Sequence, residues 1–93
     1  MKGNYHANAT GAKGTYVVND TTEAVKNHAG IFCNEDTVIA RIEINGDTGT
    51  DVKANYISTA VNALKKGVLL TAQGDDYFSA VTLTSGSVTL VLV

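Results

Sequence analysis

The sequence predicts a small all-β domain, an antiparallel β-sandwich or barrel with at most one or two short helical turns. Short runs rich in Val, Ile, Thr and Tyr recur along the chain, and turn residues such as Asn-Gly separate them. One run also alternates between apolar and polar positions. The 93 residues suffice for one domain at most. We therefore expect an extended N-terminal arm over residues 1–13 and a single β domain over residues 14–93.

Thr37–Asn45 is the clearest predicted strand. Every second residue from Val38 to Ile44 is apolar, which is typical of a strand with one face in the core. Asn45-Gly46 then favours a turn, because both residues tolerate positive φ. The other predicted strands before the C-terminal region are Gly14–Val18, Ala29–Cys33 and Gly67–Thr71.

The C-terminal region predicts a β-hairpin. Tyr77–Leu83 and Ser87–Val93 form its two arms, and Thr84-Ser85-Gly86 supplies the bend, since glycine adopts positive φ readily. The last arm is apolar on both faces, so we expect it to be buried on both sides. It is either a central strand of the domain's own core or a strand buried at a subunit interface.

Two segments have no single interpretation. In Ala54–Lys66 the spacing of Ile57, Val61 and Leu64 fits a helix, whereas Tyr56–Thr59 fits a strand followed by a loop. Glu23–His28 is long enough for one helical turn at most.

Composition favours a binding or structural role. Charged residues make up 17% of the chain, below the usual ~25%, and the net charge of −2 gives no attraction to a polyanion. We therefore expect no nucleic-acid partner. No apolar run approaches the ~20 residues that span a bilayer, and no secretory signal is apparent, so we expect no membrane association and synthesis in a cytoplasm. A small core with one cysteine favours a homo-oligomer.

No residues in the sequence have the types and spacing of a catalytic or metal-binding motif, so we expect neither an enzyme nor a cofactor. Cys33 lies in an apolar run, and His28 lies across a predicted strand boundary from it, which favours a structural thiol over a nucleophile. Asp47–Asp51 fails the spacing of a calcium-binding EF-hand loop. We interpret it as a solvated turn, with a looser cation site as the alternative. Asp75-Asp76 is interpreted as a turn.

The candidate interface residues lie at both ends of the chain. The arm is either a frayed terminus or a segment that docks on a neighbouring subunit, and an apolar last strand offers a second contact. The residues concerned are Tyr5, His6, Val91, Leu92 and Val93.

Four segments resemble one group of proteins, the short virion proteins of tailed phages. Phe78–Val88 resembles the C-terminal hairpin of that group, and three earlier segments resemble it in the same order. Those segments are Gly14–Thr22, Glu35–Ile39 and Gly67–Leu70.

The resemblance implies a capsid decoration (cement) protein or another head-associated protein. Such a protein binds the major capsid protein, commonly as a trimer on the outer shell, and holds neighbouring capsomers together. The expected location is therefore the capsid surface of the virion, after synthesis in the host cytoplasm. A receptor- or carbohydrate-binding module of a head or tail fibre is the alternative function.

Overall fold

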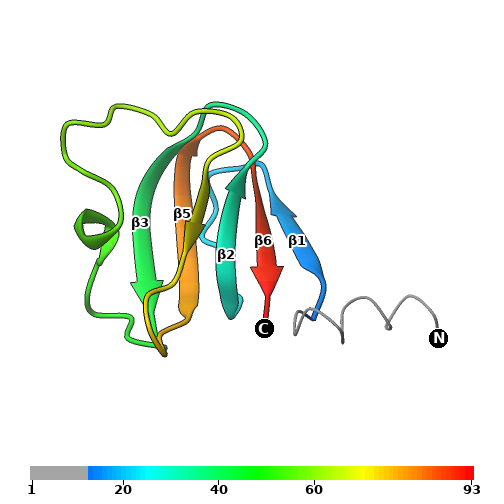
Figure 1. Ribbon diagram of the computed structural model, residues 1–93, viewed down its shortest axis with the longest axis vertical. Coiled ribbons are helices and arrows are strands. Elements are labelled where there is room, and N and C mark those ends of the chain that lie inside the picture. Colours follow the sequence, from blue (N-terminus) through cyan, green and yellow to red (C-terminus); the bar gives the residue numbers. More distant parts are fainter. Residues whose placement is uncertain (1–12) are drawn as a thin grey trace.

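The computed structural model describes residues 13–93, which form an antiparallel β structure (Figure 1). One single-turn 3-10 helix, η1, spans Lys53–Asn55. The strands are β1 (Thr15–Val18), β2 (His28–Cys33), β3 (Val38–Ile44), β4 (Leu69–Thr71), β5 (Phe78–Ser85) and β6 (Val88–Leu92). The all-β prediction is confirmed, because every strand pair is antiparallel and the helical content of this part of the chain is one short turn.

The sheet has the order β1-β6-β2-β5-β3, and β4 pairs with β2 beside this path (Figure 1). β6 occupies one edge of β2. The opposite edge is shared, because β4 pairs with Gly30–Phe32 and β5 reaches β2 only through the pair His28–Phe78. Four strands (β1, β6, β2, β4) therefore form one part of the sheet and β3 with β5 form the other.

A common core holds these two parts together. Fully burying one large aliphatic or aromatic side chain contributes about 1.5–3 kcal/mol, so the shared core outweighs the one residue pair that joins β2 to β5. The core residues come from five strands and are Val18, Ile31, Cys33, Ile39, Ile42, Phe78, Val81, Leu83, Val88 and Leu90.

The predicted C-terminal hairpin is wrong. β5 and β6 follow each other closely in the chain but do not pair: β5 pairs with β3, whereas β6 pairs with β1 and β2. Gly86 does adopt positive φ (97°), as expected for the bend. The turn rests on Thr37, whose Oγ1 accepts a hydrogen bond from Ser87 N at 3.2 Å. The chain therefore crosses from one part of the sheet to the other instead of folding back on itself.

The two ambiguous segments are irregular. Ala54–Lys66 forms neither the helix nor the strand considered, because beyond η1 it pairs with the sheet only where Leu64 meets Thr37. Its apolar side chains pack individually against the core, so tertiary contacts fix the segment without a regular backbone. Glu23–His28 contains no helical turn, since Ala24 forms an isolated bridge with Val81 and His28 begins β2.

β6 lies between β1 and β2, so the last strand is a central strand of the sheet, but the expected burial on both sides is wrong, because Thr89 and Val91 remain partly exposed. Val88 and Leu90 are fully buried there. The amide of Lys13, the first described residue, donates to the carbonyl of Leu92 at 2.9 Å. The remainder of the predicted arm, including Tyr5 and His6, lies outside the described residues.

Candidate functional site

The part of the sheet formed by β1, β6, β2 and β4 turns one uncharged side away from the core. Directly paired residues of antiparallel strands project to the same side, so the register defines rows that cross all four strands. One row is Val17, Thr89, Phe32 and Leu69, and the next is Thr15, Val91, Gly30 and Thr71. We call these eight residues the outer face.

Three apolar side chains of the outer face are largely exposed: Val17 by 58%, Phe32 by 41% and Leu69 by 53%. Gly30 makes a shallow hollow among them. A β-carbon placed on Gly30 would lie 3.4 Å from Leu69 Cδ1 and 3.5 Å from Val91 Cγ2, so both side chains border the hollow. A surface with exposed apolar groups and no charge is suited to a contact that excludes water.

The structure separates the candidate interface residues of the last strand. Val91 lies on the outer face and is half-buried, whereas Leu92 is partly buried against the core. Val93 follows the strand, is 46% exposed, and donates its amide to the Asn27 carbonyl at 3.2 Å. The sequence pattern did not single out Val17, Phe32 and Leu69 as interface residues. Their neighbours along each strand are also apolar, so only the pairing register shows that these three share one row.

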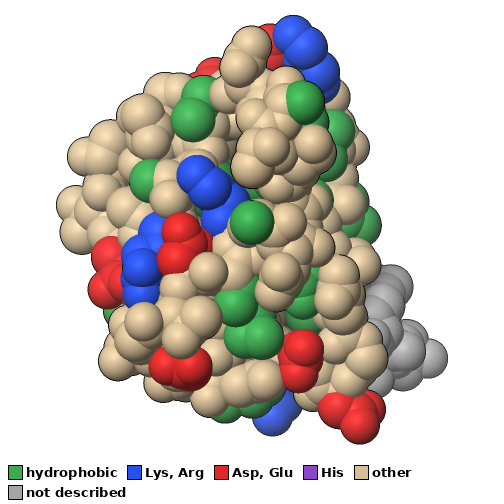
Figure 2. Space-filling view, turned by 90° about the vertical axis from the view of Figure 1, so that its left-hand side faces the viewer, with side chains coloured by type: hydrophobic (Ala, Val, Ile, Leu, Met, Phe, Trp, Pro, Cys, Tyr) green, Lys and Arg blue, Asp and Glu red, His purple; other side chains and the backbone are tan. Residues whose placement is uncertain are grey.

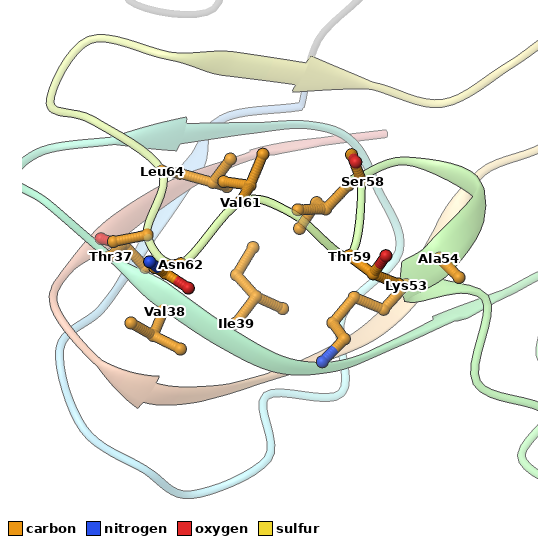
Figure 3. Close-up of a pocket in the computed structure, with 12 residues that line it drawn as sticks. Thr37, Val38, Ile39, Lys53, Ala54, Ser58, Thr59, Val61, Asn62 and Leu64 are labelled. Atoms are coloured by element: carbon orange, nitrogen blue, oxygen red, sulfur yellow. The ribbon is translucent and has the colours of Figure 1, made fainter.

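A groove of about 380 Å³ separates β3 from the segment 53–64 (Figure 3). Figure 3 shows aliphatic side chains in its middle and polar side chains toward its ends. Its lining residues include Ile39, Lys53, Ser58, Thr59, Val61 and Leu64.

His28 and Cys33 stand at opposite ends of β2, about 16 Å apart for an extended strand, so they do not form a base–nucleophile pair. Burial lowers the pKa of His28, against an opposing hydrogen bond between its Nδ1 and the Lys26 carbonyl. Its Nε2 is buried without a partner. Burial also raises the pKa of the Cys33 thiol. Both groups therefore favour their neutral forms.

In the acidic loop after β3, carboxylate groups accept hydrogen bonds from backbone amides and so stabilise the loop. Asp47 Oδ1 accepts the amide of Gly49 at 3.0 Å, and Asp51 Oδ1 accepts the amides of Ile42 at 3.1 Å and Lys53 at 2.9 Å. Burial acts to raise the pKa of Asp51, but these two hydrogen bonds and the nearby Arg41 hold it below its usual value. Across residues 13–93, no cluster of three His, Cys, Asp or Glu side chains is arranged to hold a metal ion.

Charges of both signs are interspersed on the face shown in Figure 2, with no large patch of either sign. Arg41 Nε donates to Glu43 Oε2 at 2.9 Å, and Lys65 Nζ lies 3.7 Å from Asp36 Oδ2. Opposite charges close together cancel at longer range, so these pairs do not contribute to a basic patch of the kind that attracts a polyanion.

No protein-family model matches the chain, and no curated protein or solved structure is significantly similar to it. Between residues 13 and 93, no helix has the length and apolar character needed to cross a membrane. Residues 13–93 thus form a small all-β structure that has an exposed uncharged sheet face and a surface groove beside β3.

Proposed function

We propose that this protein is a virion structural protein that binds the major capsid protein of a tailed phage and thereby decorates and stabilises the capsid. The observation that carries the proposal is the outer face. Val17, Phe32 and Leu69 expose apolar surface in a single row, and a protein partner that covers them gains the free energy of removing this surface from water. The resemblance of four segments to phage virion proteins supports the class of partner.

The size of the outer face supports multivalent binding. Four strands about 4.8 Å apart, each contributing about four residues of 3.3 Å, span roughly 250 Å². A standard stable interface buries about 800 Å² on each partner, so one such face would hold a capsid only weakly. An oligomer that docks several faces at once multiplies these contacts by avidity. A homo-oligomer, with a trimer favoured, is therefore part of the proposal.

The edge of the sheet offers a contact between copies. β1 is the terminal strand, and its residues Thr15–Val18 include neither a charge nor a proline. Natural edge strands commonly carry such residues as a guard against pairing with another chain. An unguarded β1 suits pairing with a neighbouring subunit. Tyr5 and His6 remain candidate contacts of the arm in the same assembly.

The test is co-sedimentation of the purified protein with empty capsids assembled from the major capsid protein of the same phage. The wild type is expected to sediment with the capsids, and the double variant Phe32→Asp/Leu69→Asp is expected to stay in the supernatant. Val25→Asp is the matched control, because Val25 is 69% exposed but lies outside the outer face. Equal binding of the double variant and the wild type would exclude the outer face as the docking surface, and absence of wild-type binding would reject the capsid role.

The alternative, a receptor- or carbohydrate-binding module of a fibre, has less support. A sugar platform needs exposed rings on a common surface. Tyr16 pairs with the core residue Leu90 and Phe32 pairs with Thr89, so these two rings, the exposed ones among residues 13–93, project to opposite sides of the sheet. Specific binding on a glycan array, without capsid binding, would favour this alternative.

A further inference from the structure

The turn after β3 contains Asn45-Gly46, the sole Asn-Gly pair of the sequence. Asn45 and Gly46 have φ of 55° and 77°, and the amide of Asp47 donates to the Ile44 carbonyl at 2.9 Å. Positive φ at both central residues is the mark of a type I′ turn. Both residues are exposed, so water and hydroxide reach them.

An Asn-Gly pair carries the groups for a reaction that consumes only water. The Gly46 nitrogen loses its proton to hydroxide and attacks Cγ of Asn45, and glycine has no side chain to hinder this attack. The new N–C bond closes a succinimide ring, while the bond from Cγ to Nδ2 breaks and ammonia leaves with a proton taken from water. Water then opens the ring at one of its two carbonyl carbons. The product has an aspartate or an isoaspartate at position 45.

Two hydrogen bonds hold the Asn45 carboxamide against the segment that leads into β5. Its Nδ2 donates to Asp76 Oδ1 at 2.9 Å, and its Oδ1 accepts the amide of Tyr77 at 3.1 Å. Nδ2 is the group that departs as ammonia. The hydrogen bond to Asp76 must therefore break before the reaction is complete.

The position of Asp76 is fixed by the fold. Its own amide donates to the Gln73 carbonyl at 3.0 Å, which closes a turn before β5. The register pairs Ile44 with the fully buried Phe78, so the end of β3 lies beside the start of β5 (Figure 1). The Asn45 carboxamide is consequently released only when this end of the strand pair opens locally.

We propose that Asn45-Gly46 is a deamidation site whose rate is controlled by the hydrogen bond to Asp76. The product replaces the Nδ2 donor by a carboxylate oxygen, 2.9 Å from Asp76 Oδ1, and two like charges at that distance repel. An isoaspartate also routes the main chain through its β-carbon, which breaks the turn. The modification therefore loosens the paired ends of β3 and β5 irreversibly. This inference does not depend on the capsid role, because these residues lie outside the outer face.

The test is incubation of the purified protein at mildly alkaline pH, then digestion with pepsin in acid and mass spectrometry of the peptide that contains residues 45–46. In denaturant, the product should form faster at Asn45 than at the other asparagines. The folded wild type is expected to react about a hundredfold more slowly, about tenfold for each hydrogen bond of the carboxamide.

Substitution of Asp76 should restore part of the rate. Asp76→Ala is expected to react about tenfold faster than the folded wild type, whereas Asp76→Asn keeps an acceptor oxygen and should stay close to the wild-type rate. Asp75→Ala is the matched control, because the carboxylate that accepts from Asn45 belongs to Asp76. Urea denaturation of each variant separates local release of the turn from global unfolding.

Three results would overturn the proposal. The first is the lack of product at Asn45 in denaturant, which would mean that the pair is unreactive. The second is an equal rate for the wild type in native buffer and in denaturant, which tests the protection without any substitution. The third is an equal rate for Asp76→Ala and Asp75→Ala in native buffer.

Discussion

Gly86 lies directly against Thr37, so that a β-carbon on Gly86 would be 2.6 Å from Thr37 Cα and 2.7 Å from the Asp36 carbonyl oxygen. Gly86 also has a φ of 97°, which side-chain-bearing residues rarely adopt. Both the space and the backbone conformation therefore require glycine. This contact fixes the place where the chain leaves β5 for β6, on the other part of the sheet.

Gly86→Ala is expected to lower the free energy of unfolding by about 2–5 kcal/mol, from the cost of positive φ and from overpacking against backbone atoms. Urea denaturation measures the loss. Gly14→Ala is the matched control, because Gly14 has the same φ of 97° but would place its β-carbon in open space. It should lose only about 1–2 kcal/mol. Equal losses in the two variants would show that crowding at Thr37 contributes nothing.

Acid should destabilise the fold through His28. Burial lowers its pKa in the folded protein below the ordinary 6.5, so the unfolded chain takes up the proton first as the pH falls. The contribution of the neutral ring is complete above pH 6.5 and is lost as the pH falls from there toward the folded-state pKa, by up to about 1.4 kcal/mol per pH unit. Urea denaturation between pH 7.5 and 4.5 measures this slope.

The pH experiment is best done in a His6→Gln background, so that one imidazole titrates. His28→Phe keeps a ring against Phe78, whose centroid is 5.3 Å from that of His28, and should reduce the slope. An unchanged slope in that variant would assign the acid sensitivity to carboxylates instead.

Leu92→Asp is expected to disrupt folding, with a loss of about 2–4 kcal/mol, because it removes an aliphatic group from the core boundary and brings a carboxylate there. Thermal unfolding and light scattering check both folding and assembly. Val93→Asp, one residue further and 46% exposed, should remain close to wild-type stability. Wild-type stability and oligomer size in Leu92→Asp would contradict the prediction.

Cys33 is expected to react slowly with a thiol reagent in the folded state. Its side chain is fully buried, and burial raises its pKa, so little thiolate is present at neutral pH. Labelling with Ellman's reagent should become fast only in denaturant. Labelling at the rate of free cysteine under native conditions would mean that β2 opens readily.

Much of the strand pattern could be predicted, because it depends on local residue type. The alternation in Val38–Ile44 and the apolar run around Ile31 both became strands near the expected positions. The pairing could not be predicted in the same way. A Ser-Gly turn between two β-forming runs has the same local signal in a hairpin and in a crossing between two parts of a sheet, and the contact of Gly86 with Thr37 is non-local.

The outer face and the groove were likewise only partly predictable from the sequence. Val91 was a candidate from its apolar strand, and the structure places it on the outer face. Phe32 and Leu69 share that row only because β2 pairs with β4 in one register. The groove at Lys53 depends on where an irregular segment leaves β3, and hydrophobic periodicity carries no signal for such a place.

The position of β6 also has a consequence for biosynthesis. β6 is the last strand in the sequence, yet it lies between β1 and β2, and its pairing joins Thr15 to Val91. A growing chain on the ribosome therefore has β1 and β2 without the strand that connects them until residues 88–92 emerge. Pairing between such distant segments slows folding. This protein completes its sheet only after β6 has been translated, and until then the unpaired edges of β1 and β2 are open to pairing with other chains.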